Sequence, residues 1–166
     1  VDDTGAYAWG PGTTEAAGDV WINTRWVSGS TLAMGSYDRF VLLHELGHAL
    51  GLDHPGDYDA QPGVTFTYAG AAQYQQDSRQ YTVMSYWEAV NTEADSPLAY
   101  PATLMMFDIY ALQQLYGVNS ATRAGNDVYG FGGTLGGAYD FSTYAQPQIC
   151  IWDGGGWDTL NASGYG

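Results

Sequence analysis

HELGHALGLDH, residues 44–54, contains all three histidines of a chain of 166 residues. Phe40, Leu43 and Leu46 recur at intervals of three, and this spacing predicts a helix over residues 37–50. Gly51 follows, and glycine readily takes the left-handed conformation in which many helices end. The stretch therefore predicts a helix and then a sharp turn that returns the chain toward the last turn of that helix.

The spacing of the histidines predicts a metal site. Side chains four residues apart lie on one face of a helix, so His44 and His48 present two imidazoles to a common point. The turn at Gly51 brings His54 back as a third nitrogen ligand, and Glu45 lies beside the pair, free to act on a zinc-bound water. Three protein ligands leave one tetrahedral position open, as in catalytic zinc sites. A short HExxH match can arise by chance, but the added glycine and third histidine make chance a weak explanation.

The stretch resembles the metzincin motif H-E-x-x-H-x-x-G-x-x-H. Metzincins also carry a methionine turn beneath the zinc, and YTVMSYW, residues 81–87, supplies one at Met84. HALGLDHPGDY (48–58), MSYW (84–87) and DIYALQQLYG (108–117) narrow the resemblance to the serralysins, which are secreted bacterial zinc endopeptidases. The resemblance runs from Ala6 over most of the chain.

The resemblance implies an α+β metzincin catalytic domain over residues 1–118, with a mixed sheet, an active-site helix and a C-terminal helix. The residues themselves predict strands in 6–9 and 18–27, a long ordered loop over 53–80, and a second helix over 101–116 that begins at Pro101 and stops at Gly117. Residues 119–166, rich in glycine and aspartate, are expected to begin a calcium-binding β-roll domain. Asp108, in the second helix, is expected to favour the helix dipole rather than to orient the methionine turn.

The resemblance also implies roles for individual residues. Glu45 is the expected general base, and Tyr86 is expected to stabilise the oxyanion and is a candidate fifth zinc ligand. Met84 packs under the imidazoles without binding the metal. The expected zinc ligands are His44, His48 and His54, and the strand expected to pair with a peptide substrate comprises Ala6, Tyr7, Ala8 and Trp9.

WDGGGWDTL, residues 152–160, is close to one copy of the glycine- and aspartate-rich repeat of calcium-binding β-rolls, although a plain glycine turn fits the letters equally well. The resemblance to serralysins implies a calcium site and pairs this segment with TRAGNDVYG, residues 122–130. Position 127 departs from the family, which more often has threonine there. The implied ligands are Asp127, Asp153 and Asp158, with the carbonyl groups of Arg123, Gly125 and Gly155.

The composition of the chain limits which partners and which cellular environment are expected for it. Four basic residues against 18 acidic ones give a net charge of -14, which disfavours nucleic acid and anionic membranes as partners. The single cysteine, Cys150, excludes an internal disulfide framework. With the resemblance, this predicts a secreted, extracellular protein that relies on zinc and calcium and acts on protein or peptide substrates.

Only 43 residues precede His44, so we expect the chain to lack the first strands and the long helix of a serralysin, and most of its calcium repeats. It is expected to be a fragment, a chain completed by a second piece, or a reduced member of the family. A remaining segment of the same protease and a peptide inhibitor are therefore further candidate partners. The alternative function is a non-catalytic zinc- and calcium-binding fragment or module, and only composition supports a third, an adhesion or inhibitor-binding fragment.

Overall fold

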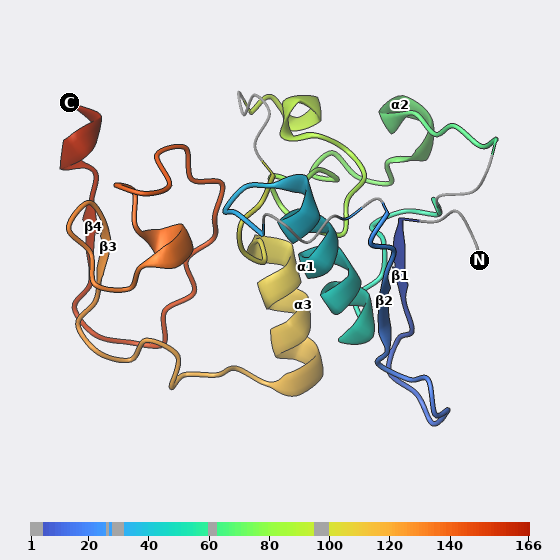
Figure 1. Ribbon diagram of the computed structural model, residues 1–166, viewed down its shortest axis with the longest axis horizontal. Coiled ribbons are helices and arrows are strands. Elements are labelled where there is room, and N and C mark those ends of the chain that lie inside the picture. The colour runs from blue at the N-terminus through green and yellow to red at the C-terminus, as the bar shows by residue number, and fades with distance from the viewer. Residues whose placement is uncertain (1–4, 26, 28–31, 60–62, 95–99) are drawn as a thin grey trace.

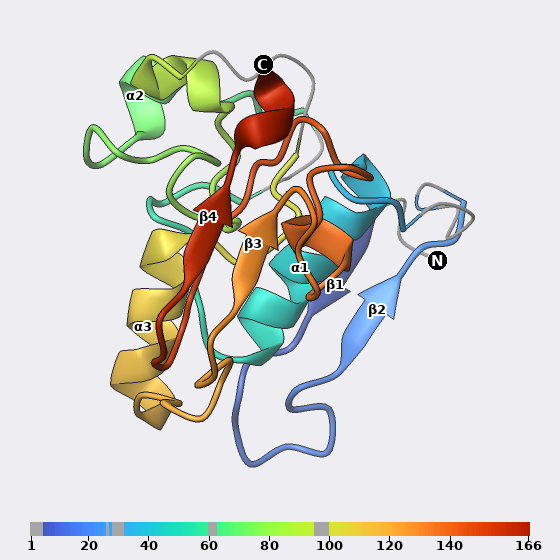
Figure 2. The ribbon, with the colours of Figure 1, turned by 90° about the vertical axis from the view of Figure 1, so that its left-hand side faces the viewer.

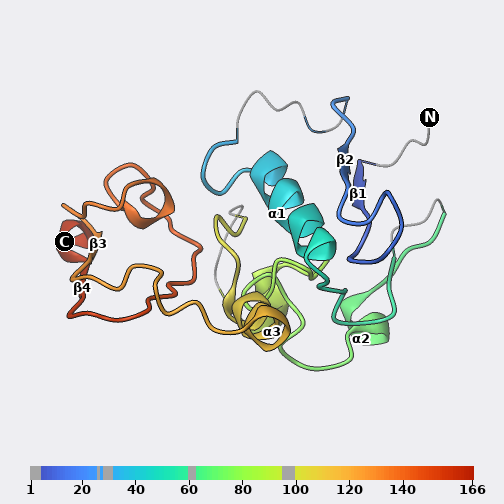
Figure 3. The same cartoon turned by 90° about the horizontal axis from the view of Figure 1, so that it is seen from below.

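The computed structural model describes residues 5–25, 27, 32–59, 63–94 and 100–166. The chain is a small α+β protein in which α1 lies between an N-terminal hairpin and a loop-rich C-terminal region (Figures 1 and 3). Its elements are β1 (Ala6–Ala8), β2 (Val20–Ile22), α1 (Tyr37–Ala49), α2 (Tyr68–Ala71), η1 (Ala89–Thr92), α3 (Met106–Tyr116), β3 (Val128–Gly130), η2 (Gly137–Tyr139), β4 (Thr159–Asn161) and η3 (Ser163–Tyr165).

Strands β1 and β2 form an antiparallel hairpin in which Ala6 pairs with Ile22. Side chains alternate across it, as strand geometry requires. Ala6 and Ile22 pack against the core, whereas the rings of Tyr7 and Trp21 are exposed and stack with centroids 6.2 Å apart. The two predicted strands are therefore present but shorter than expected.

Helix α1 confirms the predicted helix over residues 37–50. Its N-cap, Ser36, accepts a hydrogen bond from Arg39 N through its side chain. At the other end Gly51 N donates to His48 O and Leu52 N donates to Gly47 O, each at 2.9 Å. This pattern is a Schellman motif, and it needs the positive φ of 93° that Gly51 adopts. The turn sends the chain back toward the histidine face of α1.

Helix α3 begins at Met106 rather than at Pro101, so the predicted start is wrong by five residues. The cause is the side chain of Asp108, which accepts a hydrogen bond from Met105 N at 2.7 Å and fixes the N-cap there. The preceding residues are tied elsewhere, since Ala102 is buried and its N–H donates to Gln148 O. Gly117 ends the helix with a φ of 85°, as predicted.

The expected mixed sheet is not formed within the described residues. The structure has two separate two-stranded sheets, the antiparallel pair β1–β2 and the parallel pair β3–β4 (Figure 2). Each strand has only three residues, and neither pair extends to a further strand in the described part of the chain. The predicted loop 53–80 is also interrupted by the one-turn helix α2.

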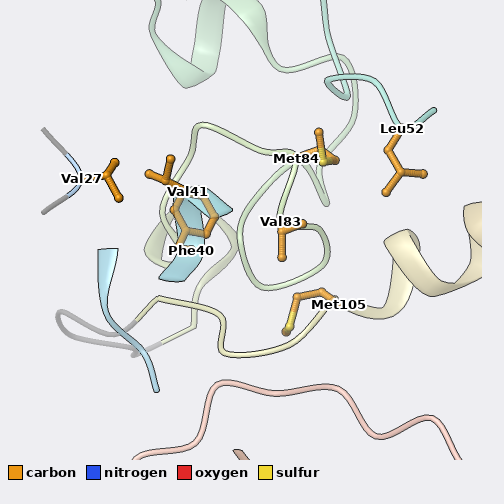
Figure 4. Close-up of a cluster of buried hydrophobic side chains, with 7 residues drawn as sticks. All are labelled: Val27, Phe40, Val41, Leu52, Val83, Met84 and Met105. Carbon is orange, nitrogen blue, oxygen red and sulfur yellow. The ribbon is translucent and has the colours of Figure 1, made fainter. Parts of the chain in front are cut away.

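The core lies between α1 and the methionine turn, residues 81–87 (Figure 4). Its buried side chains are Val27, Phe40, Val41, Leu52, Val83, Met84 and Met105. The packing is close at Gly47, where a Cβ would lie 2.5 Å from Met84 Sδ, so a larger residue there would require Met84 to move. Met84 is therefore held against the helix that carries two of the histidines.

Candidate metal centre

Three imidazoles converge at the end of α1. His54 Nε2 lies 3.1 Å from His48 Nε2 and 3.2 Å from His44 Nε2. A tetrahedral zinc ion with Zn–N bonds of about 2.0–2.1 Å separates its nitrogen ligands by about 3.3 Å. The observed spacings are within 0.2 Å of that value, so the residues fit a zinc ion, and they are the three that the sequence predicted.

The second ring nitrogen of each histidine fixes its tautomer. Each Nδ1 lies within hydrogen-bond distance of an oxygen: His44 of Val83 O at 2.8 Å, His48 of Leu52 O at 2.9 Å, and His54 of Asp59 Oδ1 at 3.1 Å. Because these oxygens only accept, the proton sits on Nδ1 and a lone pair remains on Nε2. Three lone pairs directed at one point repel each other unless a cation lies between them.

Burial keeps two of these rings neutral. It lowers the pKa of His44 to about 3, and it lowers the pKa of His54, with a further contribution from the neighbouring His48. Neutral imidazole is the form that binds a metal ion. His44 and His54 can therefore bind a metal ion at neutral pH without first losing a proton.

Asp59 belongs to the centre but was not predicted. It is five residues from His54, in a loop whose shape brings its carboxylate to the imidazole Nδ1. Carboxylates in this position orient a ligand histidine and raise its basicity. Sequence spacing carried no signal for Asp59, because loop geometry rather than helical periodicity sets the contact.

We expect Asp59→Asn to weaken zinc binding about tenfold. This is the lower end of the usual range for carboxylates that hydrogen-bond a ligand histidine, because the Asp59 side chain is 77% exposed and its charge is screened by solvent. The measurement is zinc affinity by competition with a chromophoric chelator. Asp57→Asn is the matched control, since Asp57 is exposed in the same loop and removes the same charge. Equal losses in both variants would mean that only net charge matters.

Glu45 lies on α1 between the two helical histidines and is only 6% exposed. Burial raises its pKa to about 7, so the carboxyl exchanges a proton near neutral pH. A group with that pKa is suited to act as a general base and then as a general acid. A bound cation lowers this value by stabilising the carboxylate.

The pKa of Glu45 predicts how stability depends on pH. Because it rises from 4.5 to about 7 on folding, the folded metal-free chain binds this proton more tightly than the unfolded chain. Glu45 therefore destabilises the fold above about pH 7, and the effect disappears as the pH falls through 4.5. In chelator, Glu45→Gln is expected to be more stable than wild type by up to about 3 kcal/mol near pH 8 and equal to it near pH 4. Urea unfolding across pH measures this, and a pH-independent difference would contradict it.

Asp108 holds the methionine turn through hydrogen bonds. The expectation that Asp108 favours the helix dipole rather than orienting this turn is therefore corrected. Its carboxylate is 2% exposed and accepts hydrogen bonds from Thr82 Oγ1 at 2.5 Å and Val83 N at 2.8 Å, besides Met105 N. Val83 O in turn accepts from His44 Nδ1. The buried carboxylate thus connects the start of α3 to a metal ligand through one residue of the turn.

Tyr86 lies where the sequence analysis expected it, beside the histidines. Its ring centroid is 4.7 Å from that of His54 and 6.0 Å from that of His44. Tyr58, which the sequence did not single out, stacks on His54 beside Tyr86, with its ring 5.4 Å from that of His54 at an interplanar angle of 18°. Two tyrosines therefore pack against the third histidine.

The strand expected to bind substrate also lies near the centre. Strand β1 pairs with β2 on one edge, and its other edge has no strand partner within the described residues. The chain after β1 runs close to α1, since a Cβ on Gly10 would lie 3.7 Å from His48 O. Of the four expected residues, Tyr7 and Trp9 are exposed and Ala6 and Ala8 are half-buried.

The three aspartates expected to bind calcium come together in the C-terminal region. One carboxylate oxygen from each of Asp127, Asp153 and Asp158 lies within 4.8 Å of the others. Asp127 Oδ2 is buried and has no hydrogen-bond partner among the described residues. The guanidinium of Arg123 lies 4.9 Å from the ring centroid of Tyr139 and donates to Trp152 O, next to Asp153.

A family model described as Peptidase M10 serralysin C terminal matches residues 118–166. Over 165 residues the chain is 42% identical to Serralysin B of Dickeya chrysanthemi, covering 98% of the chain. It is 41% identical to Serralysin of Proteus mirabilis over 162 residues, or 96% of the chain, and 43% identical to Metalloprotease AprA of Pseudomonas entomophila over 156 residues, or 89% of the chain. The chain belongs to the serralysin family.

The similarity covers only part of each relative. The chain spans 34% of Serralysin B and 32% of both the Proteus mirabilis serralysin and AprA, so it corresponds to about a third of a serralysin's length. Among the described residues, no helix has the length and apolar character needed to cross a bilayer.

Proposed function

We propose that this serralysin chain carries the catalytic centre of a secreted zinc endopeptidase that cleaves peptide bonds in proteins. The observation that supports this most strongly is the convergence of three imidazoles, with Nε2 spacings of 3.1 and 3.2 Å, next to a buried glutamate whose pKa is raised to about 7. A structural zinc site has no use for a proton-accepting group beside an open position.

His44, His48 and His54 would hold the zinc ion, each oriented through its Nδ1. When bound, zinc supplies a Lewis acid that lowers the pKa of a coordinated water to about 7 and polarises a carbonyl oxygen. Glu45 accepts a proton at its carboxylate and returns it to the nitrogen of the departing amine. Met84 packs beneath the site and makes no bond to the metal.

Tyr86 supports the same reaction as a hydrogen-bond donor. Its position against His54 is consistent with donation from the phenol to an oxyanion that develops on the substrate carbonyl. The same position is compatible with a role as a fifth zinc ligand when no substrate is present. Both functions depend on where the ring lies relative to the imidazoles.

We propose that substrate binds in an extended conformation along β1, over Ala6, Tyr7, Ala8 and Trp9. The edge of β1 that has no strand partner among the described residues offers main-chain N–H and C=O groups, and pairing with main-chain groups is largely independent of side-chain identity. Broad cleavage of protein substrates is the expected consequence. Trp9 and the stacked pair of Tyr7 and Trp21 add exposed apolar surface beside this edge.

Calcium is the second proposed metal, and we propose that the chain divides into a catalytic part, residues 1–118, and the start of a calcium-binding β-roll, residues 119–166. The buried Oδ2 of Asp127, which has no hydrogen-bond partner in the part of the chain that the structure describes, supports a cation at the aspartate cluster. The proposed ligands are Asp127, Asp153 and Asp158, with the carbonyl groups of Arg123, Gly125 and Gly155. Secretion is the matching location, because extracellular calcium is abundant enough to fill such sites.

The test is metal removal and replacement with casein as substrate. The chain, saturated with calcium, is expected to cleave casein, to lose activity when a zinc-selective chelator removes one zinc per chain, and to recover it on addition of zinc. Calcium concentration stays constant, so that loss of the aspartate site cannot account for the change. One zinc per chain without cleavage would favour the alternative function, a non-catalytic zinc- and calcium-binding module.

A further inference from the structure

Two residues outside the metal centre hold the segment that carries Tyr86. Asp77 is fully buried, and its Oδ1 accepts hydrogen bonds from Ser85 Oγ at 2.7 Å and from Tyr58 Oη at 2.8 Å. One of these donors directly precedes Tyr86 in the chain. The other is the tyrosine that stacks on His54, and its ring centroid lies 4.9 Å from that of Tyr86. Asp77 thus fixes both the backbone before Tyr86 and the ring beside it.

Arg79 holds the same segment from its other side. Its Nη2 donates to Tyr86 O and its backbone N–H donates to Trp87 O, both at 2.9 Å. The guanidinium packs against two aromatic rings, 4.9 Å from the centroid of Phe40 and 5.2 Å from that of Tyr100. Phe40 is on α1, one turn before His44, so Arg79 joins Tyr86 to the helix that carries the metal ligands.

The environment of Arg79 is not that of a surface charge. In the described part of the chain no carboxylate lies close enough to form an ion pair with it, and its Nε is buried without a hydrogen-bond partner. Removing part of a cation from water without an ion pair costs free energy. The specific contact of the guanidinium is with the carbonyl of Tyr86, so a role at that residue explains why the half-buried cation is held there.

We propose that Asp77 and Arg79 are positioning residues that fix the ring of Tyr86 beside His54 and influence catalysis only through Tyr86. The inference rests on the proposed function, in which Tyr86 stabilises the oxyanion. Tyr86 lies in a turn rather than in a helix or strand, so no regular hydrogen-bond ladder holds it. A displacement of about 1 Å at a catalytic group can lower a rate by about 100-fold. Contacts that fix the position of Tyr86 can therefore affect catalysis.

The experiment is a double-mutant cycle on an internally quenched peptide, with kcat and KM measured at equal zinc content. Arg79→Met is expected to lower kcat about tenfold with little change in KM, and Arg79→Lys, which keeps a donor and the charge, to lower it less. In a Tyr86→Phe background, Arg79→Met is expected to lower kcat less than about twofold, because its target is already gone. Arg25→Met removes an exposed arginine and serves as the matched control.

Tyr58→Phe is a milder second variant, which keeps the ring and removes the hydroxyl that donates to Asp77. It is expected to lower kcat about threefold, again only when Tyr86 is present. A readout independent of activity is the ¹⁹F resonance of Tyr86 in fluorotyrosine-labelled, metal-free protein, assigned with Tyr86→Phe. We expect it to shift in Arg79→Met and in Tyr58→Phe but not in Arg25→Met.

The outcomes separate this inference from the proposed function. If Arg79→Met lowered kcat equally in the wild-type and Tyr86→Phe backgrounds, or left the ¹⁹F resonance unchanged, the positioning role would be overturned and the endopeptidase would remain intact. If the Tyr86→Phe variant alone kept the wild-type kcat, the role of Tyr86 would be overturned, and with it the positioning role of Asp77 and Arg79. A zinc-loaded wild type that cleaves nothing would overturn the proposed function itself.

Discussion

Glu45→Gln is expected to lower kcat about 10³-fold while the chain still binds one zinc. Glutamine has nearly the same shape as glutamate, so the buried position of Glu45 stays filled and the three imidazoles keep their places. What it lacks is a carboxylate that can accept a proton. The proposed reaction needs that group twice, first to take a proton and then to return it to the departing amine.

The measurement is kcat and KM on a peptide substrate, with zinc content determined on the same samples. Glu15→Gln is the control, because Glu15 is exposed in the loop between β1 and β2 and the change in charge is the same. The variant should also lose the acid limb of the wild-type pH profile. That limb is expected at or below about pH 7, since burial raises the pKa of Glu45 to about 7 and a bound cation lowers it. If the Glu45→Gln variant lost its zinc together with its activity, Glu45 would be needed for the structure of the site, and the prediction that it acts as a general base would be contradicted.

The parts of the site that the sequence predicted are those governed by short-range periodicity. His44 and His48 are four residues apart on one helix, and Gly51 permits the turn that returns His54, so local geometry alone brings three ligands together. Met84 and Tyr86 were found differently. Their positions came from a family resemblance, because nothing in their spacing links them to the histidines.

The site residues that the sequence did not predict lie in irregular segments and reach the site through tertiary contacts. Asp59 reaches His54 through an irregular segment, and Asp77 and Arg79 hold Tyr86 through side-chain contacts that periodicity does not encode. The start of α3 was placed too early for a related reason. Pro101 is a reasonable first helical residue by propensity, but the carboxylate of Asp108 binds Met105 N and sets the cap there. Tertiary hydrogen bonds outweighed the local preference.

Replacing Asp108 with alanine is expected to destabilise the fold by about 3–5 kcal/mol. The substitution removes the acceptor of three hydrogen bonds in a buried site and leaves the N–H groups of Val83 and Met105 unpaired. A small domain has only about 5–15 kcal/mol of stability in total, so the effect is large. Urea unfolding in the presence of calcium and zinc measures it, with the exposed Asp19→Ala as control.

Asp108→Asn separates the hydrogen bonds from the charge. The asparagine oxygen can accept from Val83 N and Met105 N, while its amide donates to Thr82 Oγ1, so all three contacts survive without a carboxylate. We expect a loss of less than about 1 kcal/mol, because burial raises the pKa of Asp108 and the neutral amide avoids that desolvation.

The alanine variant is also expected to weaken zinc binding about tenfold or more, because Val83 O, which orients His44, belongs to the turn that Asp108 holds. The asparagine variant should keep wild-type affinity. If both variants lost stability and zinc equally, the charge of Asp108 rather than its three acceptor contacts would hold the turn. If neither lost zinc affinity, the methionine turn would keep its shape through the packing of Val83 and Met84 alone.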